Sequence, residues 1–425
     1  MSRLGWMRSC GSSWGGSVAE WQRVVRDLEA DGVLLVQDGN HGEYRPRPAE
    51  FGDTGTAFIR AADMRGGRLL FESAQKINEI ARERVRKGIG APCDVVLSHK
   101  GTVGKVAFAP AASPPFVCSP QTTFWRSLNH EVIDPQYLYA FLRSEPFKAQ
   151  LRARENESDM AAYVSLTEQR RLSVTVPPLA IQRAISDVLG VLDEKITVNE
   201  RIAGRALELA DAQFASSAQG LDFGPDTFGS TATVVGGGTP STKTEEYWGG
   251  GIAWTTPTDV TALSAPYLFE TGRTVTGEGL ENCASRLYPA QSIFMTSRAT
   301  IGAFALPQMP AAVNQGFIVV LPPTEELRWW LLHEMRSRVE EMISLANGST
   351  FLELSRKNFK AMTIRLASER NSAEFARAVA PLHRRAAQAT AESRTLAALR
   401  DTLLPQLMAG KLRVRDAEKI VEDAV

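Results

Sequence analysis

One stretch, from Pro177 to Phe214, constrains this chain more than any other part of the sequence. It opens with two prolines, which are accepted before a helix or in its first turn but not in its interior. No further proline follows, and apolar residues recur three and four positions apart, which is typical of an amphipathic helix with a narrow apolar seam. At ~1.5 Å per residue this helix is roughly 55 Å long. A helix of that length indicates a spacer or an arm.

A second stretch of the same kind, from Phe375 onward, ends the chain and closes at Gly410, which is placed as a helix C-cap. Pro381 is expected to kink or split its first turns. The predicted seam residues are Ile185, Leu189, Leu192 and Ile196 in the first helix and Leu382, Leu396, Leu399 and Leu403 in the second. Asn199 falls on the first seam. It either fixes the register between the helices or lies exposed because the seam drifts.

Length and composition indicate an ordinary soluble protein. A chain of 425 residues predicts two or three domains. The net charge of zero argues neither for nor against a nucleic-acid partner, because local patches decide that. The four cysteines lack C-x-x-C spacing, which fits a reducing cytoplasm without disulfides or zinc. The sequence predicts no membrane span and no secretory signal, and residues 1–17 read as a flexible extension or as a start codon placed too early.

The two globular segments repeat each other in order, about 190 residues apart. GIAWTTPTDV (251–260) matches GTAFIRAADM (55–64), with Asp259 in the place of Asp63. QSIFMTSRATIGAFALP (291–307) matches CDVVLSHKGTVGKVAFAP (93–110), and both predict a β-hairpin. Gly101 and Gly104 are expected to supply positive φ in the first of these turns.

Local patterns around the hairpins predict further elements. They are a helix over 18–32 running into a strand over 33–36, a charged helix over 73–87, a pair of strands within 116–126, a helix over 135–151 and a glycine-rich loop over 233–251.

This arrangement resembles the specificity subunit of type I restriction–modification systems. Three segments carry the resemblance: GGGTPSTKTEEYWGGGIAWTTPTDV (236–260), PPLAIQRAISDVLGVLDEKITVNERI (177–202) and RTLAALRDTLLPQLMAGKLRV (394–414). The first is similar to the start of a target recognition domain, and the others are similar to the family's two central helices. The likeness covers nearly the whole chain. The first globular segment departs from it, with DGNHGEYRPRP instead of a GGTP opening.

The resemblance implies an α/β fold in which two similar target recognition domains are joined by two long helices. The helices are expected to pair as an antiparallel coiled coil, which gives a pseudo-two-fold internal repeat. Such symmetry suits a DNA site made of two half-sites. The expected divisions are an extension (1–17), recognition domain 1 (18–176), helix 1 (177–219), recognition domain 2 (220–368), helix 2 (369–412) and a charged tail (413–425).

The implied function is non-catalytic recognition of double-stranded DNA in the cytoplasm. In the family each recognition domain reads half of a bipartite site, and the helices set the spacer and bind two modification subunits. Those subunits carry methyl transfer from S-adenosylmethionine, and restriction subunits that use ATP and Mg²⁺ may be absent or present in a given system. This chain is expected to hold no cofactor or metal of its own.

The candidate DNA-contacting residues lie in the hairpin turns and in two loops that mix aromatic and basic side chains. They are His41, Tyr44, Arg45, Arg47, Arg60, Lys100, Thr102, Lys243, Tyr247, Arg298, Thr300 and Asn314. Lys100 and Arg298 either contact a guanine edge or a phosphate or are solvated turn charges. For Thr102 and Thr300 a capping role is favoured over a phosphate contact. Asn314 and Gln315 can read adenine, although a turn role is favoured, and Trp248 and Trp254 belong either to the core or to a DNA-facing surface.

Signals for an enzyme are weak. Ser113–Phe116 fits the [DNS]-P-P-[YFW] pattern of amino-methyltransferases, but the glycines at 236–238 are not followed by a helix, so a loop is favoured. Asp193-Glu194-Lys195 resembles the end of a nuclease motif without its partner acid, which favours solvated charges. There is no P-loop, and the five histidines lack ligand spacing.

Two alternatives to this reading stay open. The chain could serve another phage-defence methyltransferase system, which the neighbouring genes would reveal. It could also be a coiled-coil assembly protein without DNA specificity, although that function leaves the paired basic turns without a use.

Overall fold

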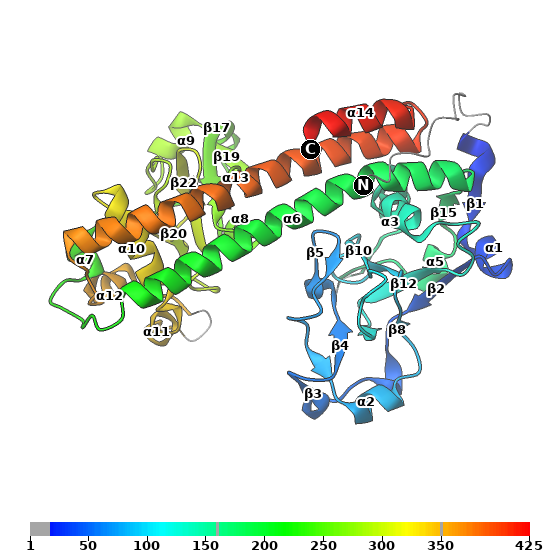
Figure 1. Ribbon diagram of the computed structural model, residues 1–425, viewed down its shortest axis with the longest axis horizontal. Coiled ribbons are helices and arrows are strands. Elements are labelled where there is room, and N and C mark those ends of the chain that lie inside the picture. The colour runs from blue at the N-terminus through cyan, green and yellow to red at the C-terminus, as the bar shows by residue number, and fades with distance from the viewer. Residues whose placement is uncertain (1–17, 159–160, 349–351) are drawn as a thin grey trace. The chain divides into compact units, whose positions relative to one another are not determined.

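A computed structural model describes residues 18–158, 161–348 and 352–425 and divides the chain into two compact units (Figure 1). Unit 1 is Met1–Glu194 with Leu396–Val425, and unit 2 is Lys195–Thr395. The predicted N-terminal extension, 1–17, lies outside the described residues. The fold is the predicted α/β architecture, with repeated mixed sheets and two long helices.

Unit 1 is built on two large sheets, and its described residues also form two two-stranded sheets, β1 (Gln22–Val24) with β15 (Ser173–Thr175) and β13 (Asn156–Ser158) with β14 (Ala161–Tyr163). The larger has the strand order β2-β12-β9-β10-β6-β5, formed by Leu34–Asp38, Thr122–Ser127, Val95–Ser98, Val106–Phe108, Arg68–Leu69 and Met64–Arg65. The other has the order β3-β7-β4-β11-β8, formed by Phe51–Gly52, Lys76–Ile77, Thr56–Ile59, Phe116–Cys118 and Ile89–Gly90. Apolar residues of β9 and the aromatic side chains of Phe124 and Trp125 are buried and hold the sheets to the helices.

The predicted hairpin is confirmed, and both strands predicted within 116–126 form, but they do not pair with each other. Val106 of β10 pairs antiparallel with Leu97 of β9, and both glycines of the turn have positive φ. Strand β11, however, pairs with β4 and β8, while β12 pairs with β2 and β9. The chain changes sheets at Ser119, whose N–H donates to the carbonyl of Ile59 at 2.8 Å. Strand partners far apart in sequence therefore outcompete the neighbouring strand.

Three predicted helices are shorter or broken. The helix over 18–32 is reduced to α1 (Val25–Ala30), because β1 (Gln22–Val24) pairs with β15 (Ser173–Thr175). The helix over 73–87 is reduced to α2 (Glu79–Arg84), because β7 joins a sheet. The helix over 135–151 divides at Ser144 into α3 (Pro135–Arg143) and α4 (Glu145–Arg152), as expected where Pro146 restricts the preceding residues.

Unit 2 repeats the sheet arrangement of unit 1. Among its described residues one sheet has the order β16-β23-β20-β21-β18, formed by Thr233–Gly236, Phe317–Leu321, Ile293–Thr296, Phe304–Pro307 and Tyr267–Leu268. The other has the order β19-β17-β22, formed by Arg273–Val275, Trp248–Thr255 and Ala311–Val313. Strands β16 and β17 thus take the first four and the last four residues of the glycine-rich loop predicted over 233–251, which leaves 237–247 as the loop.

The match between Asp63 and Asp259 is confirmed in atomic detail. Each carboxylate accepts the main-chain N–H three residues before it, from Arg60 at 2.9 Å and from Thr256 at 2.7 Å. Both aspartates follow a strand that pairs in parallel, β4 with β11 and β17 with β22. The repeat therefore extends from strand order to the turns that end the strands.

The long helices are α6 (Leu179–Ser217) and α13 (Glu369–Met408). Within unit 2 they run antiparallel, since the ring centroids of Phe214 and Phe375 lie 5.7 Å apart, and Lys195 and Glu392 pair at 3.3 Å. Buried alanines between these contacts let the backbones approach closely; they are Ala203, Ala206, Ala210, Ala386 and Ala389.

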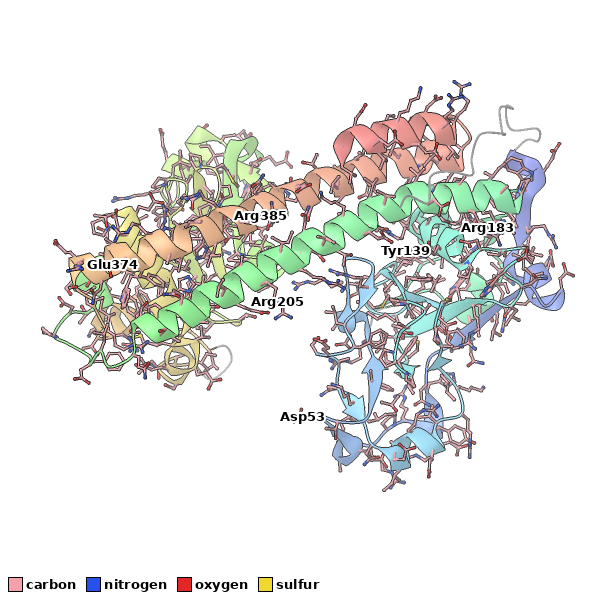
Figure 2. All side chains as sticks on the ribbon, viewed as in Figure 1. Asp53, Tyr139, Arg183, Arg205, Glu374 and Arg385 are labelled. Atoms are coloured by element: carbon pink, nitrogen blue, oxygen red, sulfur yellow. The ribbon has the colours of Figure 1, made fainter. Side chains whose placement is uncertain are left out.

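Within unit 1 the other ends of the two helices also meet. Asp193 of α6 pairs with Arg400 of α13 at 2.7 Å and with Arg143 of α3 at 2.9 Å. Arg143 also donates to the hydroxyl of Tyr139, which Figure 2 shows beside α6. Of the predicted seam residues in both units, Ile185, Leu189, Leu192, Leu396 and Leu403 are buried, and Ile196, Leu382 and Leu399 are half-buried.

The end of α13 follows the prediction, but its first turns do not. The helix continues across Pro381, so the expected split is absent. At the other end, Gly410 has φ 65°, its N–H donates to Leu407 O at 3.1 Å, and Lys411 N–H donates to Gln406 O at 2.9 Å. This is the Schellman pattern of a glycine C-cap. A further helix, α14 (Val414–Ala424), lies along this end of α13 (Figure 1), where the sequence indicated only a charged tail.

Unit 2 also contains a buried chain of hydrogen bonds. The hydroxyl of Tyr267 and His383 Nδ1 are 2.9 Å apart, His383 Nε2 and His333 Nε2 are 2.9 Å apart, and His333 Nδ1 lies 2.7 Å from a carboxylate oxygen of Asp211. Arg336 holds the same carboxylate with two further hydrogen bonds. One proton order satisfies every atom: Tyr267 donates to His383, His383 donates to His333 and His333 donates to Asp211. Both imidazoles are neutral in that order.

Asn199 is buried in unit 2, with 1% of its surface exposed, which excludes the alternative of an exposed residue. Within the described part of the chain neither amide atom has a hydrogen-bond partner. A buried polar group without a partner costs about 1–3 kcal/mol.

We therefore expect Asn199→Leu, which is similar in size and apolar, to raise the free energy of unfolding by about 1–2 kcal/mol. Urea unfolding would measure the change. Asn371→Leu, at an exposed position on α13, is the matched control and should have little effect. A loss of stability in Asn199→Leu would show that the amide has a partner, such as a bound water, that the apolar side chain cannot replace.

Candidate nucleic-acid interface

In each unit, two strands end together at one edge of a sheet. In unit 1, β2 and β9 both pair antiparallel with β12, so they run in the same direction. The loop 39–50 and the turn 99–104 leave from this edge, which we name edge 1. In unit 2, β16 and β20 flank β23 in the same way, and the loop 237–247 and the turn 297–302 form edge 2. Most candidate residues predicted from the sequence lie at these two edges.

The turn at edge 1 is held by main-chain hydrogen bonds. Val164 N–H donates to the carbonyl of His99 at 3.0 Å, and Gly101 N–H donates to that of Ala162 at 2.9 Å. Gly104 N–H closes the turn on Ser98 O at 2.9 Å.

The turn at edge 2 repeats these bonds. Leu354 N–H donates to the carbonyl of Ser297 at 2.9 Å, Ala299 N–H to Leu352 O at 3.2 Å, and Gly302 N–H to Thr296 O at 3.0 Å. Ala299 has φ 59° where unit 1 has Gly101 at 78°, so the backbone conformation is kept even where a side chain makes it costly. The scaffold of the two turns is therefore the same.

The basic side chains on this common scaffold differ in the partners that they contact. Lys100 and Arg298 are both exposed and both form a β-bridge, with Tyr163 and Glu353 respectively. Lys100 extends over the Tyr163 ring, with its ammonium 6.0 Å from the ring centre. Arg298 instead pairs with the Glu353 carboxylate at 2.9 Å. Arg298 must leave that partner before it can contact a base or a phosphate. Thr102 and Thr300 are exposed beside them.

At edge 1 a loop of two 3₁₀ turns presents the other candidates of unit 1. His41, Tyr44, Arg45 and Arg47 are exposed along η3 (Gly42–Tyr44) and η4 (Pro48–Glu50). These positions mix aromatic and basic side chains at the surface, which suits groove insertion and phosphate contact.

Arg84 fixes the shape of this loop. It donates to the Glu50 carboxylate at 2.9 Å and to the carbonyl of Arg45 at 3.2 Å. The hydrogen bond from Arg84, with a second from the main-chain N–H of Arg47, lowers the pKa of Glu50 to about 2. The loop is thus held by an ion pair across neutral pH, while the side chains of Arg45 and Arg47 lie exposed.

At edge 2 two tryptophans hold the loop. Trp254 is buried and donates to the carbonyl of Gly238 at 3.2 Å, so it belongs to the core. Trp248 is half-buried, donates to the carbonyl of Ser241 at 3.0 Å and carries the Arg273 guanidinium 3.6 Å above its ring. Lys243 is exposed and Tyr247 is half-buried in the same loop.

Two candidates have structural partners. The side chain of Asn314 accepts from Gly316 N–H at 2.8 Å, a hydrogen bond within the turn. Arg60 grips the Asp63 carboxylate with two side-chain bonds, at 3.0 and 3.2 Å, and also donates to Gln75. These bonds occupy Arg60 in the turn that ends β4.

Comparison with known proteins decides the family. The sequence profile of a family described as "Type I restriction modification DNA specificity domain" matches residues 43–205 and 227–376, together well over half of the chain. The chain belongs to this family of type I restriction–modification DNA specificity domains. The second matched segment contains all of edge 2, and the first contains edge 1 except residues 39–42.

Individual relatives agree. The type I restriction enzyme MjaIX specificity subunit of Methanocaldococcus jannaschii is 36% identical over 133 residues, which is 31% of each protein. The HindI specificity subunit of Haemophilus influenzae is 21% identical over 67% of this chain and 79% of its own length. The chain thus spans about a third of the length of the first of these relatives and most of the second.

A solved structure shares the fold. The crystal structure of the type I restriction–modification system S subunit from M. genitalium covers 91% of this chain and 95% of its own, with a TM-score of 0.50 and 14% identity. The likeness supports the predicted architecture of a specificity subunit.

The motifs that suggested catalysis have structural roles in this specificity-domain chain. Phe116 of the Ser113–Phe116 motif is buried in β11. Asp193 of the nuclease-like triplet is held by Arg143 and Arg400. Within the described ranges no group of histidine, cysteine and acidic side chains is placed to hold a metal ion. No described helix has the length and apolar character needed to cross a bilayer.

Sequence reasoning missed basic residues that the specificity-domain fold brings to edge 1. Arg86 and Lys87 are exposed and follow α2. The next residue, Gly88, packs so closely on the loop that a Cβ there would lie 2.4 Å from Asn40 N. The basic pair before a glycine was the available signal, but both cations were included in the charged helix predicted over 73–87.

Proposed function

We propose that this chain is the DNA-recognition subunit of a type I restriction–modification complex, in which each unit reads one half of a bipartite site. The observation that carries the proposal is the pair of edges. Their turns share main-chain hydrogen bonds and backbone conformation, while their side chains differ. A common backbone scaffold that carries different DNA-contacting side chains suits two half-sites of different sequence.

The chemistry of modification and cleavage belongs, in this proposal, to partner subunits. Two modification subunits dock on the long helices and supply S-adenosylmethionine-dependent methyl transfer, and restriction subunits use ATP and Mg²⁺. The long helices set the spacer between the half-sites. The family assignment supports this division of labour, and no observation favours a coiled-coil assembly protein instead.

Methylation mapping tests the proposal. DNA from cells that express the chain with its modification subunit should carry a split motif of two unlike blocks, and deletion of the chain should abolish it. Methylation that persists without the chain would contradict the proposal.

Single substitutions at the two edges should separate the half-sites. We expect Lys100→Ala to weaken or relax recognition of one block and Arg298→Ala to do the same for the other, each by about 10- to 100-fold, as expected for one lost base or phosphate contact. The measurement is the methylation rate on DNA panels that vary one block at a time. Lys419→Ala, on α14, is the control for loss of an exposed cation. Two variants that alter the same block would contradict the assignment of one block to each unit.

A further inference from the structure

We propose that Arg356, Lys357 and Lys360 of unit 2 form a contact surface for the phosphate backbone of DNA, named here the α12 surface. The proposal rests on the proposed function and extends it to residues that the sequence did not single out. The three side chains are exposed on α12 (Arg356–Ala361). Together with Thr227 and Gly229 they line an open hollow of about 630 Å³.

The three cations of the α12 surface differ from other basic side chains of unit 2 in their ion pairing. Within the described part of the chain, none of the three has a carboxylate partner. Other arginines of unit 2 are neutralised close by: Arg336 by Asp211 at 2.6 Å and Arg365 by Glu334 at 2.8 Å. Three adjacent cations that repel one another are stabilised when an anion binds between them.

The α12 surface lies next to edge 2. The guanidinium of Arg356 lies over Gly236, the last residue of β16, where a Cβ would come within 3.1 Å of it. Just before α12, Leu354 is hydrogen-bonded to Ser297 of the turn at edge 2. The α12 surface is therefore continuous with edge 2, and a side chain at Gly236 would displace Arg356.

The side chains of the α12 surface are chemically suited to bind phosphate groups. Arginine and lysine on flexible stems, beside a threonine and a glycine, suit phosphate oxygens, which are uniform along DNA. The corresponding helix of unit 1, α5 (Leu166–Gln169), also follows a serine N-cap. Its matching positions are Leu166, Thr167 and Arg170, and Arg170 is paired with Glu29 at 2.7 Å. The α12 surface is thus a feature of one unit and not of the repeat.

The test is the salt dependence of DNA binding by the chain assembled with its modification subunits. The logarithm of the DNA-binding constant decreases linearly with the logarithm of the salt concentration. For the triple variant R356Q/K357Q/K360Q we expect this dependence to become shallower by about 2.7 in slope, which corresponds to three lost phosphate contacts. Affinity at about 0.1 M salt should fall on the order of 100-fold. The methylated sequence should stay the same, because phosphates carry no sequence information.

The control is K411Q/R415Q/K419Q, which removes three exposed cations at and beside α14 and should leave the slope unchanged. Urea unfolding of both variants would show that each is folded. An unchanged slope in the α12 variant would overturn the inference. So would a changed half-site, which indicates base reading, or failure to bind the modification subunits, which indicates a protein-docking surface. If the wild-type complex recognises no split site, the proposed function itself fails.

Discussion

Lowering the pH from about 7 to about 5 is expected to destabilise unit 2 by at least about 2 kcal/mol through the buried histidine chain. Burial, reinforced by neighbouring His333 and Arg336, lowers the pKa of His383 to about 2. Burial also lowers the pKa of His333, although Asp211 opposes the shift. Burial raises the pKa of Asp211, but the hydrogen bonds from His333 and Arg336 outweigh it and bring the pKa below its usual range.

The direction of the effect follows from proton uptake. In the unfolded chain His383 binds a proton near pH 6.5, whereas in the folded unit its pKa of about 2 keeps it neutral down to pH 5. Its contribution to stability is therefore fully present above about pH 6.5 and declines by about 1.4 kcal/mol per pH unit as the pH falls, and the lowered pKa of His333 acts in the same direction. The carboxylate of Asp211 stays ionised throughout this window. Protonation of His333 would place a second proton on its Nε2, where it faces the N–H that His383 already donates, and this breaks the chain.

Hydrogen exchange of the α10 amides (Glu325–Arg336) at several pH values would measure this loss in unit 2 alone. His383→Gln keeps one donor and one acceptor but does not titrate, so it should remove the share of the pH dependence that His383 contributes, about 2 kcal/mol between pH 7 and pH 5. His130→Gln, at an exposed position of unit 1, should leave it unchanged. Wild-type pH dependence in His383→Gln would show that the buried imidazole does not control acid stability.

The second large effect is expected from Glu334→Gln. The Glu334 carboxylate is fully buried and accepts hydrogen bonds from Arg338 at 3.1 Å, from the Arg365 side chain at 2.8 and 3.1 Å, and from Arg365 N–H at 3.2 Å. Neutralising the acid leaves two guanidinium groups without their shared buried anion. Breaking such a group typically costs about 3–5 kcal/mol. Urea unfolding followed by tryptophan fluorescence would measure the change, because Trp330 donates to the carbonyl of Arg365 at 2.7 Å.

Glu341→Gln is the matched control for this effect. Glu341 also pairs with Arg338, at 2.7 Å, but its side chain is 46% exposed. Water can replace much of that interaction, so a loss of under about 1 kcal/mol is expected. Equal losses in the two variants would show that burial of Glu334 does not set its contribution.

The elements predicted well from the sequence are those fixed by local patterns. The seam spacing and the flanking prolines indicated α6, and Gly410 marked the end of α13, because helix signals depend on neighbours within a few residues. The hairpin of β9 and β10 was readable for the same reason. Because each pattern occurs in both halves of the chain, the two halves could be aligned. That alignment matched Asp63 with Asp259 from the sequence alone.

The features that sequence reasoning missed depend on partners far along the chain. Strand β11 chose β4 and β8 over the adjacent β12. No local sequence pattern around Arg298 predicts its ion pair with Glu353, because that partner lies far along the chain. The five histidines looked scattered, yet His333 and His383 meet through α10 and α13. At edge 1, Arg86 and Lys87 arrive through a segment that was assigned to a regular helix.

The main-chain bonds that hold the two hairpin turns have a consequence for how new specificities arise. Because the N–H and carbonyl groups fix each turn, the residues at Lys100 and Arg298 contribute little to its shape and can change without disturbing the sheet behind them. Mutations can therefore change the DNA-contacting side chains at these two positions with little effect on the stability of the fold. Selection for a different target then acts on a few exposed side chains, while the buried strands remain under separate constraint.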